Sequence, residues 1–405
     1  MRNFAWMSSN QFFHIANPEI QEYIFLHENE DEKKLVLAHK EIFGVPASLI
    51  ANQIQGRKKA KQKIDLWYKT KGIIYPPSLN LEQSSSAPTA KFKSTLIVKG
   101  KIGVDLTGGF GVDTFFLSQN FEKFYYVEPN ETLLSTAKHN HLLLGATNIE
   151  YVNATAEEFL IQTKEYFDLI FIDPSRRNNQ QKVFKLADCI PDVSSLMPSF
   201  LKLSKEILIK TSPLLDIQQG QRELQNVQKI FVVSVHNEVK ELLFLIKKET
   251  SAPSSIEAVD LNTHSELIHS FIFHTEAEKK AVAEFCPPLS FLYEPIASVL
   301  KAGDFKTIAL RHRVYKLHQS THLFTSENKI DEFPGKTFKI LHRVKLDKKL
   351  KEFFPDGYAN ILTRNFPLSV EEIKKKTGLK EGGQLFLICT QSEKEKHILV
   401  AERVN

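Results

Sequence analysis

Cysteine is scarce in this sequence of 405 residues, and the three that are present lie far apart. Cys189, Cys286 and Cys389 offer neither a disulfide framework nor the paired spacing of zinc ligands. No apolar run is long enough to span a membrane, and the first residues lack the apolar core and small-residue cleavage site of a secretion signal. We therefore expect a cytoplasmic protein without a membrane segment.

A phosphate-binding loop and a metal-binding pattern are also missing. The sequence contains no G-x-x-x-x-G-K-[ST] run, so a P-loop is unsupported. His318 and His322 stand four residues apart, a spacing that would place them on one face of a helix. The surrounding sequence has the character of strands, so we expect no metal site there.

Charge is unevenly distributed along a chain whose formal net charge is only +5. Residues 286–405 hold 21 Lys and Arg against 14 Asp and Glu, a net of +7, so the preceding residues are slightly acidic. A basic region of this kind favours an anionic partner such as RNA. Residues 57–71, RKKAKQKIDLWYKTK, form a second basic run. That run is typical either of a solvated helix face with two anchoring aromatic side chains, or of a surface that binds phosphates and stacks a base.

The order of the patterns predicts several domains, as expected for this length. Apolar residues at helical spacing over 17–71 predict an N-terminal helical region, and the Pro- and Ser-rich residues 75–89 predict a loop or linker. From about 90 to 248, apolar strands alternate with amphipathic helices, which is the signature of a parallel sheet. After SAPSS at 251–255 and a helix near 275–285, the sequence becomes rich in strands, and FKTIALRHRVYKLHQSTHLFTS predicts paired strands.

A glycine-rich loop follows the first strand of the alternating region, in IGVDLTGGFGVDTFFLSQ at 102–119. The loop glycines are Gly108, Gly109 and Gly111. Asp105 ends the strand, and the glycines let the backbone turn and approach a ligand without a Cβ in the way. A dinucleotide fingerprint would place its third glycine at 114, where this chain has Thr114. The loop therefore indicates a ligand other than NAD.

Polar residues stand at the ends of the strands that follow. Glu128 ends the second strand 17 residues after Gly111, where an acid can accept both hydroxyls of a ribose. The third to fifth strands end at Asn153 and Ala154, at Asp173, and at Lys210. The amide of Asn153 is suited to an adenine edge. Two further apolar segments have too few residues between them for a helical crossover, so they must pair antiparallel.

These features together resemble the class I S-adenosylmethionine-dependent methyltransferases. The resemblance rests on VDLTGGFG, on the acid in YYVEPN, on FDLIFIDPSRR and on the final antiparallel hairpin. Thr107 departs from the pattern, because many members have the first glycine of the loop there. Within the superfamily, the chain is most similar to bacterial methyltransferases with a C-terminal THUMP-like domain. That similarity adds the residues Glu82, Gln83, Ser84, Ser85, Ser86, Ala90 and Lys93, the DP-x-RR strand end, Tyr293-Glu294-Pro295 and Lys301-Ala302-Gly303.

The resemblance implies an α/β fold, with a seven-stranded Rossmann-like methyltransferase sheet, an N-terminal helical region and a C-terminal α+β module. The implied domains are a helical region and linker at 1–89, the methyltransferase domain at 90–250, a connector at 251–285, a ferredoxin-like segment at 286–334 and a THUMP-like domain at 335–405. S-adenosylmethionine is the implied cofactor. RNA is the implied partner, because THUMP modules are associated with RNA.

The site residues follow from the strand ends and the resemblance together. We assign cofactor binding to Asp105, Thr107, Gly109, Gly111, Glu128, Asn153, Ala154 and Asp173. The candidates for catalysis are Asp173, Pro174 and Arg176. The candidates for substrate binding are Ser175, Arg176, Arg177 and Lys210.

Residues 173–177 differ from the comparable motif of amino-nitrogen methylases, Asp/Asn-Pro-Pro-aromatic, in which carbonyl groups hold the amine and the aromatic ring stacks on a flipped base. Ser175 and Arg176 replace the second proline and the aromatic residue. A guanidinium can stack on a base or bind a phosphate through two hydrogen bonds, and Asp173 can position the acceptor group. Alternatively, Asp173 and the arginines form only an ion pair that holds the loop, and Lys210 only extends its ammonium from a strand end.

Three functions stay open on these grounds. The first is an RNA methyltransferase that acts on a base by direct, non-covalent transfer. The second is a small-molecule or protein methyltransferase, and the third is an inactive RNA-binding protein of the same fold. A covalent route to pyrimidine C5 is disfavoured, because no cysteine stands at the end of the fourth or fifth strand. The basic C-terminal residues favour the first function.

Overall fold

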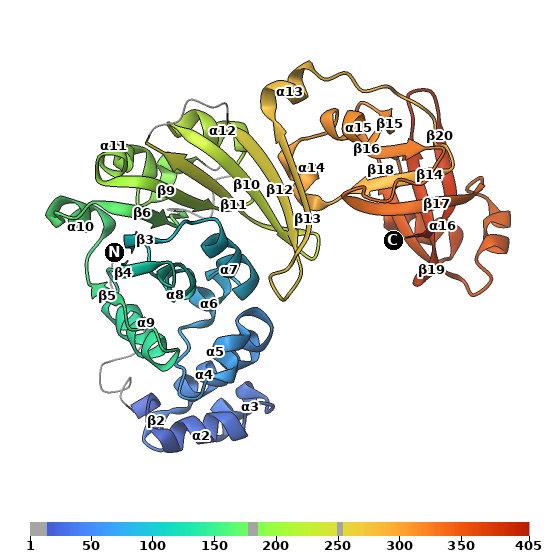
Figure 1. The fold of residues 1–405 in the computed structure, drawn as a ribbon. Helices are drawn as coiled ribbons and strands as arrows, with labels where there is room; N and C mark the ends of the chain where they lie inside the picture. The colour runs from blue at the N-terminus through green and yellow to red at the C-terminus, as the bar shows by residue number, and fades with distance from the viewer. Residues whose placement is uncertain (1–13, 177–184, 249–253, 405) are drawn as a thin grey trace. The chain divides into compact units, whose positions relative to one another are not determined.

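The computed structural model describes residues 14–176, 185–248 and 254–404 (Figure 1). The chain divides into two compact units. The first comprises residues 1–236, 240–252 and 261–267, and the second comprises residues 237–239, 253–260 and 268–405. Each unit has apolar cores of its own. Within the described ranges, no helix combines the length and the apolar character needed to cross a membrane.

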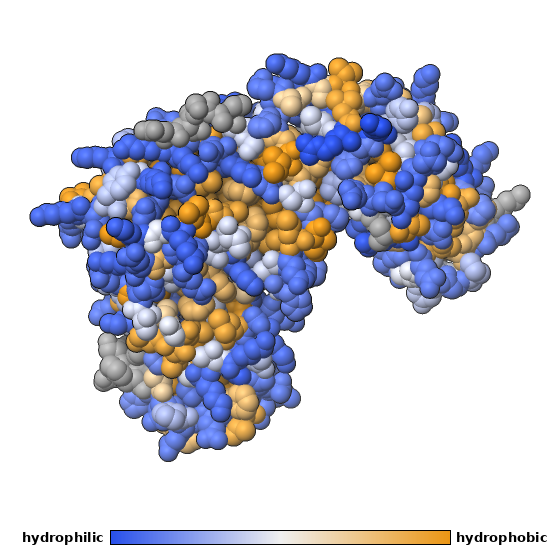
Figure 2. All heavy atoms as spheres, viewed as in Figure 1, coloured by the Kyte–Doolittle hydropathy of each residue, from blue (hydrophilic) through white to orange (hydrophobic). Residues whose placement is uncertain are grey.

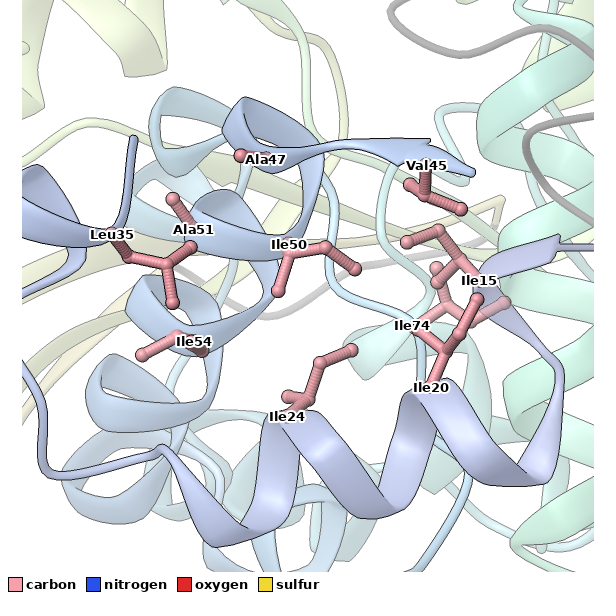
Figure 3. Packing of buried hydrophobic residues seen from close by; sticks show 10 residues of the cluster. All are labelled: Ile15, Ile20, Ile24, Leu35, Val45, Ala47, Ile50, Ala51, Ile54 and Ile74. Atoms are coloured by element: carbon pink, nitrogen blue, oxygen red, sulfur yellow. The ribbon is translucent and has the colours of Figure 1, made fainter. Parts of the chain in front are cut away.

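The predicted N-terminal helical region is confirmed, and its helices pack around an isoleucine-rich core. The helices are α2 (Pro18–Leu26), α3 (Glu32–Ala38), α4 (Ala47–Lys63) and α5 (Asp65–Lys69), and β1 (Glu41–Ile42) pairs with β2 (Val45–Pro46). Asn17 caps α2 by accepting a hydrogen bond from the N–H of Glu19. Figure 3 shows Ile20 and Ile24 of α2 in one cluster with Ile50 of α4.

Residues 75–89, predicted as a loop or linker, contain one short helix and the start of another. Helix α6 spans Ser78–Gln83 and α7 spans Ala87–Thr95. Proline is compatible with the first turn of a helix, because the N–H that it lacks has no partner there, and Pro88 occupies this place in α7. The proline-rich composition therefore marks a helix start in this segment.

Nine strands form a mixed sheet in the order β13-β12-β10-β11-β9-β6-β3-β4-β5. They are β3 (Gly100–Asp105), β4 (Phe121–Val127), β5 (Ile149–Val152), β6 (Phe167–Ile172), β9 (Ser204–Thr211), β10 (Val227–Val235), β11 (Glu238–Lys247), β12 (Ser255–Leu261) and β13 (Leu267–His274). The five strands from β9 to β5 are parallel, whereas β11 is antiparallel to β9. The predicted mixed α/β sheet is confirmed, with two strands more than the seven predicted.

The parallel strands bring their carboxyl ends to one edge of the sheet. In β6, the four residues before Asp173, Leu169 to Ile172, are each exposed by 1% or less, as expected of a strand covered on both faces. The helices between the strands are α8 (Val112–Ser118), α9 (Glu131–Leu143), α10 (Ala156–Gln162), α11 (Val193–Leu203) and α12 (Ile217–Glu223). A short ribbon of β7 (Ser175–Arg176) and β8 (Cys189–Ile190) follows β6. This edge is where ligands of such sheets bind.

The second unit contains a seven-stranded sheet in the order β15-β16-β14-β17-β20-β19-β18. Its strands are β14 (Phe291–Pro295), β15 (Tyr315–His318), β16 (Thr321–Ser326), β17 (Gly335–Arg343), β18 (Tyr358–Arg364), β19 (Lys380–Gln391) and β20 (Lys396–Arg403). Its helices are α13 (Thr275–Lys280), α14 (Ala297–Ala302), α15 (Thr307–His312), α16 (Val370–Thr377) and the 3-10 helix η2 (Lys348–Phe353). The predicted α+β character is confirmed.

One detail of the second unit differs from the sequence-based expectation. FKTIALRHRVYKLHQSTHLFTS was predicted as paired strands, but its first part forms α15, which ends at Arg313 with φ +54°. The paired strands are β15 and β16 alone. The run Ile308-Ala309-Leu310 is too short for its period to separate a helix from a strand.

Figure 2 shows polar side chains over most of the visible surface and apolar side chains in separate patches.

Candidate active site

A pocket of about 810 Å³ lies at the carboxyl edge of the parallel strands. This volume is in the range of small-molecule and cofactor sites. The predicted residues that line it are Asp105, Thr107, Gly109, Gly111, Glu128, Asp173, Pro174, Ser175 and Lys210. Asn153 and Ala154 do not line it. Arg176 is placed through its backbone in β7, and Arg177 lies outside the described residues.

The glycine-rich loop is held so tightly that two of its glycines, Gly108 and Gly111, have no room for a side chain. Gly111 has φ +82°, and a Cβ there would lie 2.6 Å from the ring of His141. A Cβ on Gly108 would lie 2.3 Å from the ring of Tyr126. The loop therefore requires glycine at both positions for reasons of space, and at Gly111 also because of its backbone conformation.

His141 contacts the glycine-rich loop and supports it as a neutral ring. Burial lowers the pKa of His141 to about 4. The neutral ring has one donor and one acceptor nitrogen, so Nε2–H donates to the carbonyl of Gly111 at 2.8 Å and Nδ1 accepts from the hydroxyl of Tyr151 at 3.0 Å. His141 could not be recognised from the sequence, because a histidine inside a helix has no distinctive pattern.

Thr107, the departure from the usual loop pattern, connects two strand ends. The N–H of Asp173 donates to the Thr107 hydroxyl at 2.7 Å, and that hydroxyl lies 3.3 Å from Oδ1 of Asp105. Asp105 also accepts from the N–H of Thr107 at 2.9 Å and from the hydroxyl of Thr114 at 2.6 Å. Burial raises the pKa of Asp105 to about 7. A glycine at 107 would lack the hydroxyl that links β3 to the end of β6.

Glu128 is buried at the end of β4 with both carboxylate oxygens engaged. Oε2 accepts from the N–H of Gly109 at 2.9 Å, and Oε1 accepts from the N–H of Asn130 at 2.9 Å. Burial raises the pKa of Glu128. The amide of Asn153 donates to the carbonyls of Glu128 and Pro129 at 2.9 and 3.1 Å, so it braces the end of β4. Each carboxylate oxygen of Glu128 keeps a lone pair for a ligand hydroxyl.

Asp173 and Lys210 belong to a network of buried charges. The Lys210 ammonium donates to Asp173 and to the hydroxyl of Ser85, the latter at 3.0 Å, and lies 3.4 Å from Asp113. Ser85 donates to Asp113 at 2.6 Å. Burial opposes the charge of Lys210, but the carboxylates of Asp173, Asp113 and Glu241 outweigh it and raise the Lys210 pKa. Lys210 is therefore an ion-paired residue of the pocket wall, not a strand-end lysine that extends into solvent.

A second lysine stands behind the first and is completely buried. Lys93 Nζ lies 2.6 Å from Glu241 and 3.1 Å from Asp113. Burial raises the pKa of Asp113, but the two lysines outweigh it, so the net shift is downward. Asp173 and Lys210 were predicted from the sequence, Ser85 and Lys93 entered only as marks of resemblance, and Asp113 and Glu241 were not predicted. Glu241, in the middle of β11, carries no sequence pattern that points to the pocket.

The basic run at 57–71 is largely occupied within the N-terminal helices. Arg57 pairs with Glu28 at 2.5 Å and Lys58 with Glu32 at 2.6 Å. Lys63 donates to the carbonyl of Leu81 at 2.8 Å. Trp67 is fully buried. These contacts favour the interpretation as a helix face with anchoring aromatic side chains.

Comparisons with known proteins cover almost the whole chain. Residues 291–334 match the family model of a ferredoxin-like domain, and residues 335–403 match a model described as THUMP domain-like. The crystal structure of a candidate methyltransferase from Porphyromonas gingivalis W83 is 31% identical, covers 98% of this chain and 100% of that chain, and superimposes with a TM-score of 0.87.

Two curated relatives add information on the chemistry. An uncharacterized S-adenosylmethionine-dependent methyltransferase of Mycobacterium tuberculosis is 21% identical over 315 residues, which is 77% of this chain and 83% of that protein. An uncharacterized RNA methyltransferase of Mycoplasma mobile is 25% identical over 138 residues, which is 33% of this chain and 38% of that protein.

Proposed function

The chain belongs to the family of S-adenosylmethionine-dependent methyltransferases with C-terminal ferredoxin-like and THUMP-like domains, and we propose that it methylates a base in RNA. The proposed reaction is direct transfer without a covalent enzyme–RNA intermediate. An RNA substrate would place the protein in the cytoplasm.

The described pocket fits the cofactor. Its glycine-rich wall has no Cβ atoms that would obstruct a nucleoside, and Glu128 offers carboxylate oxygens to ribose hydroxyls. When bound, S-adenosylmethionine supplies a methyl group that its sulfonium makes electrophilic. We propose that Asp105, Thr107, Gly109 and Gly111 hold the cofactor through the loop. Asn153 and Ala154 are proposed to support the cofactor site without contacting the cofactor, because the amide of Asn153 braces the end of β4.

Asp173 is the proposed residue that positions the acceptor. Its side chain is 32% exposed, and its Oδ2 pairs with Lys210. Oδ1 can then accept a hydrogen bond from an N–H of the substrate base and orient the nitrogen. Pro174, Ser175 and Arg176 follow directly and are proposed to contact the same base, together with Arg177. The Thr107 hydroxyl holds the backbone of Asp173 in place.

A covalent mechanism has little support from the cysteines near the pocket. Cys189 is fully buried in β8, opposite Arg176 of β7, and its Sγ lies 3.6 Å from the carbonyl of Lys185. Cys189 is absent from the lining, whereas its neighbours Ile190 and Pro191 are part of it. A thiolate that attacks a pyrimidine must reach the base, so direct transfer is the better proposal.

The observation that carries the RNA proposal is the THUMP domain-like match within a chain that holds a methyltransferase pocket. Residues 286–405, which include the match, have a net charge of +7. A basic region of this kind binds the phosphate backbone through long-range attraction. The RNA methyltransferase of Mycoplasma mobile supports the same substrate class.

The test is methyl transfer to RNA from cells that lack the gene. Purified protein, S-adenosylmethionine with a labelled methyl group and that RNA should yield labelled RNA, and mass spectrometry of its nucleosides should identify one methylated base. Asp173→Asn should reduce the rate by tenfold or more. Label that enters protein or small molecules instead of RNA would contradict the proposal.

A further inference from the structure

Five charged side chains of alternating sign connect the core of the first unit to the pocket. In order of contact they are Glu241 on β11, Lys93 on α7, Asp113 on α8, Lys210 on β9 and Asp173 after β6. They come from five different elements, so only the folded chain brings them together.

The network formed by these five side chains carries one more negative than positive charge. It contains three carboxylates and two ammonium groups, and the two ends are both carboxylates. Lys93 is 0% exposed and Glu241 is 3% exposed, so water screens this excess only weakly. Each lysine lies between two carboxylates and is already neutralised. Lys240 also lines the pocket, but the carboxylates of Asp113, Glu128, Glu157 and Asp173 outnumber the ammonium groups of Lys210 and Lys240 in the lining, so a negative excess faces whatever binds there.

The pocket side of this network faces the cofactor site. Asp113, Asp173 and Lys210 line the same pocket as the glycine-rich loop and Glu128. S-adenosylmethionine has a net charge of +1, because its sulfonium and ammonium outweigh its carboxylate. S-adenosylhomocysteine, which is left after transfer, has lost the sulfonium charge and is neutral overall.

We propose that the network of charged side chains from Glu241 to Asp173 acts as a counter-ion for the sulfonium of the cofactor. This network makes the pocket prefer the cationic methyl donor to its neutral product. Attraction between the negative excess and the sulfonium favours the loaded cofactor, and transfer removes that attraction, so the product leaves more easily. The inference depends on the cofactor of the family and not on RNA as the substrate.

The number of charged side chains in this network has a physical reason. Asp173 paired with Lys210 alone would be a neutral pair with little preference for a cation. Asp113 on the other side of Lys210 restores one negative charge, but a second buried carboxylate needs a counter-ion of its own. Lys93 supplies it and in turn requires Glu241. Ser85 lies between the two lysines at 3.3 and 3.0 Å and keeps their spacing.

The test measures binding of the two ligands to charge variants of the full chain. Glu241→Gln keeps the shape, lies outside the pocket lining and brings the network to zero net charge. The ratio of the Kd for S-adenosylhomocysteine to the Kd for S-adenosylmethionine should fall on the order of tenfold by calorimetry. The double variant Lys93→Met with Glu241→Gln returns the network to one negative charge, so its ratio should return to within about twofold of the wild-type ratio.

Glu206→Gln is the matched control. Glu206 is a carboxylate of the same sheet that pairs with Lys247 at 3.0 Å, and neither residue lines the pocket. The ratio should not change in this variant. If Glu241→Gln does not fold, adding Asp113→Asn to the double variant again gives zero net charge with fewer buried ions, and the same loss is expected. An unchanged ratio in a folded variant of zero net charge overturns the proposal, as does an equal loss in the double variant.

Discussion

The two walls of the pocket are built on different physical principles. The glycine-loop wall, defined by Gly108, Gly111 and Glu128, relies on missing side chains and on hydrogen bonds to backbone groups. The charged wall, defined by Asp173 and Lys210, relies on ion pairs between side chains of opposite charge. The first wall fails when atoms are added, and the second fails when a charge is removed.

The consequences of damage differ accordingly. A steric fault in the glycine-loop wall is local, because the clash involves one or two neighbouring side chains. A removed charge in the charged wall leaves several partners without a counter-ion, and the penalty extends to α7 and β11. Substitutions in the two walls should therefore be distinguishable by the size and the range of their effects.

Removing Lys210 is expected to have the largest effect. Lys210→Met leaves the buried carboxylate of Asp113 and the partly exposed carboxylate of Asp173 without the ammonium between them. The free energy of unfolding should fall by about 3–5 kcal/mol, measured by denaturant titration. Lys247→Met is the control, because Lys247 pairs with Glu206 but is 35% exposed, and its loss should cost below about 1 kcal/mol. Similar losses in both variants would contradict the assignment of Lys210 to a network of largely buried ion pairs.

Adding a methyl group to the glycine-loop wall should have the next largest effect. Gly111→Ala combines a left-handed backbone with a clash against His141, so the free energy of unfolding should fall by about 2–4 kcal/mol and cofactor binding should be lost. Gly145→Ala is the matched control, because Gly145 has φ +84° and no atom within 4 Å of an added Cβ. It should cost only the backbone strain, about 1–2 kcal/mol, with the Kd for S-adenosylmethionine unchanged. If both variants bind alike, the steric account of this wall is wrong.

The same contrast explains what could be predicted from the sequence. The glycine-loop wall depends on residues close together in the chain, so the spacing from Asp105 through the glycines to Glu128 indicated it directly. The apolar run before Asp173 likewise predicted a buried strand that ends in the pocket. Local patterns thus indicated nine of the residues that line the pocket.

Asp173 and Lys210 of the charged wall were predicted from the strand ends, but the partners that connect them to the core could not be predicted in this way. Lys93 contacts Glu241 across 148 positions of sequence, and Ser85 contacts Lys210 across 125. Such pairs form only once the helices and strands have packed, and no periodicity encodes them. The proline-rich segment before α7 was predicted as a loop or linker for a related reason, since helix caps and turns share the same residues.

A test of pH dependence refines the account of the glycine-loop wall. Burial raises the pKa of Asp105 to about 7, above its value in an unfolded chain, so the folded state binds the proton more tightly. The stabilisation from this group is complete below about pH 4 and is lost as the pH rises through about 7. Asp105→Asn lacks that titration. Relative to the variant, wild-type stability should decline by about 3–4 kcal/mol between pH 4 and 8 in thermal unfolding. A constant difference across this range would contradict the raised pKa.

The smallest expected effect concerns Glu128, where a loss of cofactor binding must be distinguished from a loss of stability. Glu128→Ala removes the proposed acceptor of the ribose hydroxyls and should weaken S-adenosylmethionine binding by about 1.5–3 kcal/mol, roughly tenfold to a hundredfold in Kd by calorimetry. The substitution also leaves the N–H groups of Gly109 and Asn130 without their acceptor, so a change in stability is expected as well.

Asp168→Ala controls for that second effect. Asp168 accepts from the N–H groups of Lys101 and Ile102, at 2.6 and 3.2 Å, but does not line the pocket. A folded Asp168→Ala protein should keep the wild-type Kd while losing stability to a similar degree. If Glu128→Ala also keeps the wild-type Kd, Glu128 only braces the loop, and the glycine-loop wall must hold the cofactor through its backbone alone.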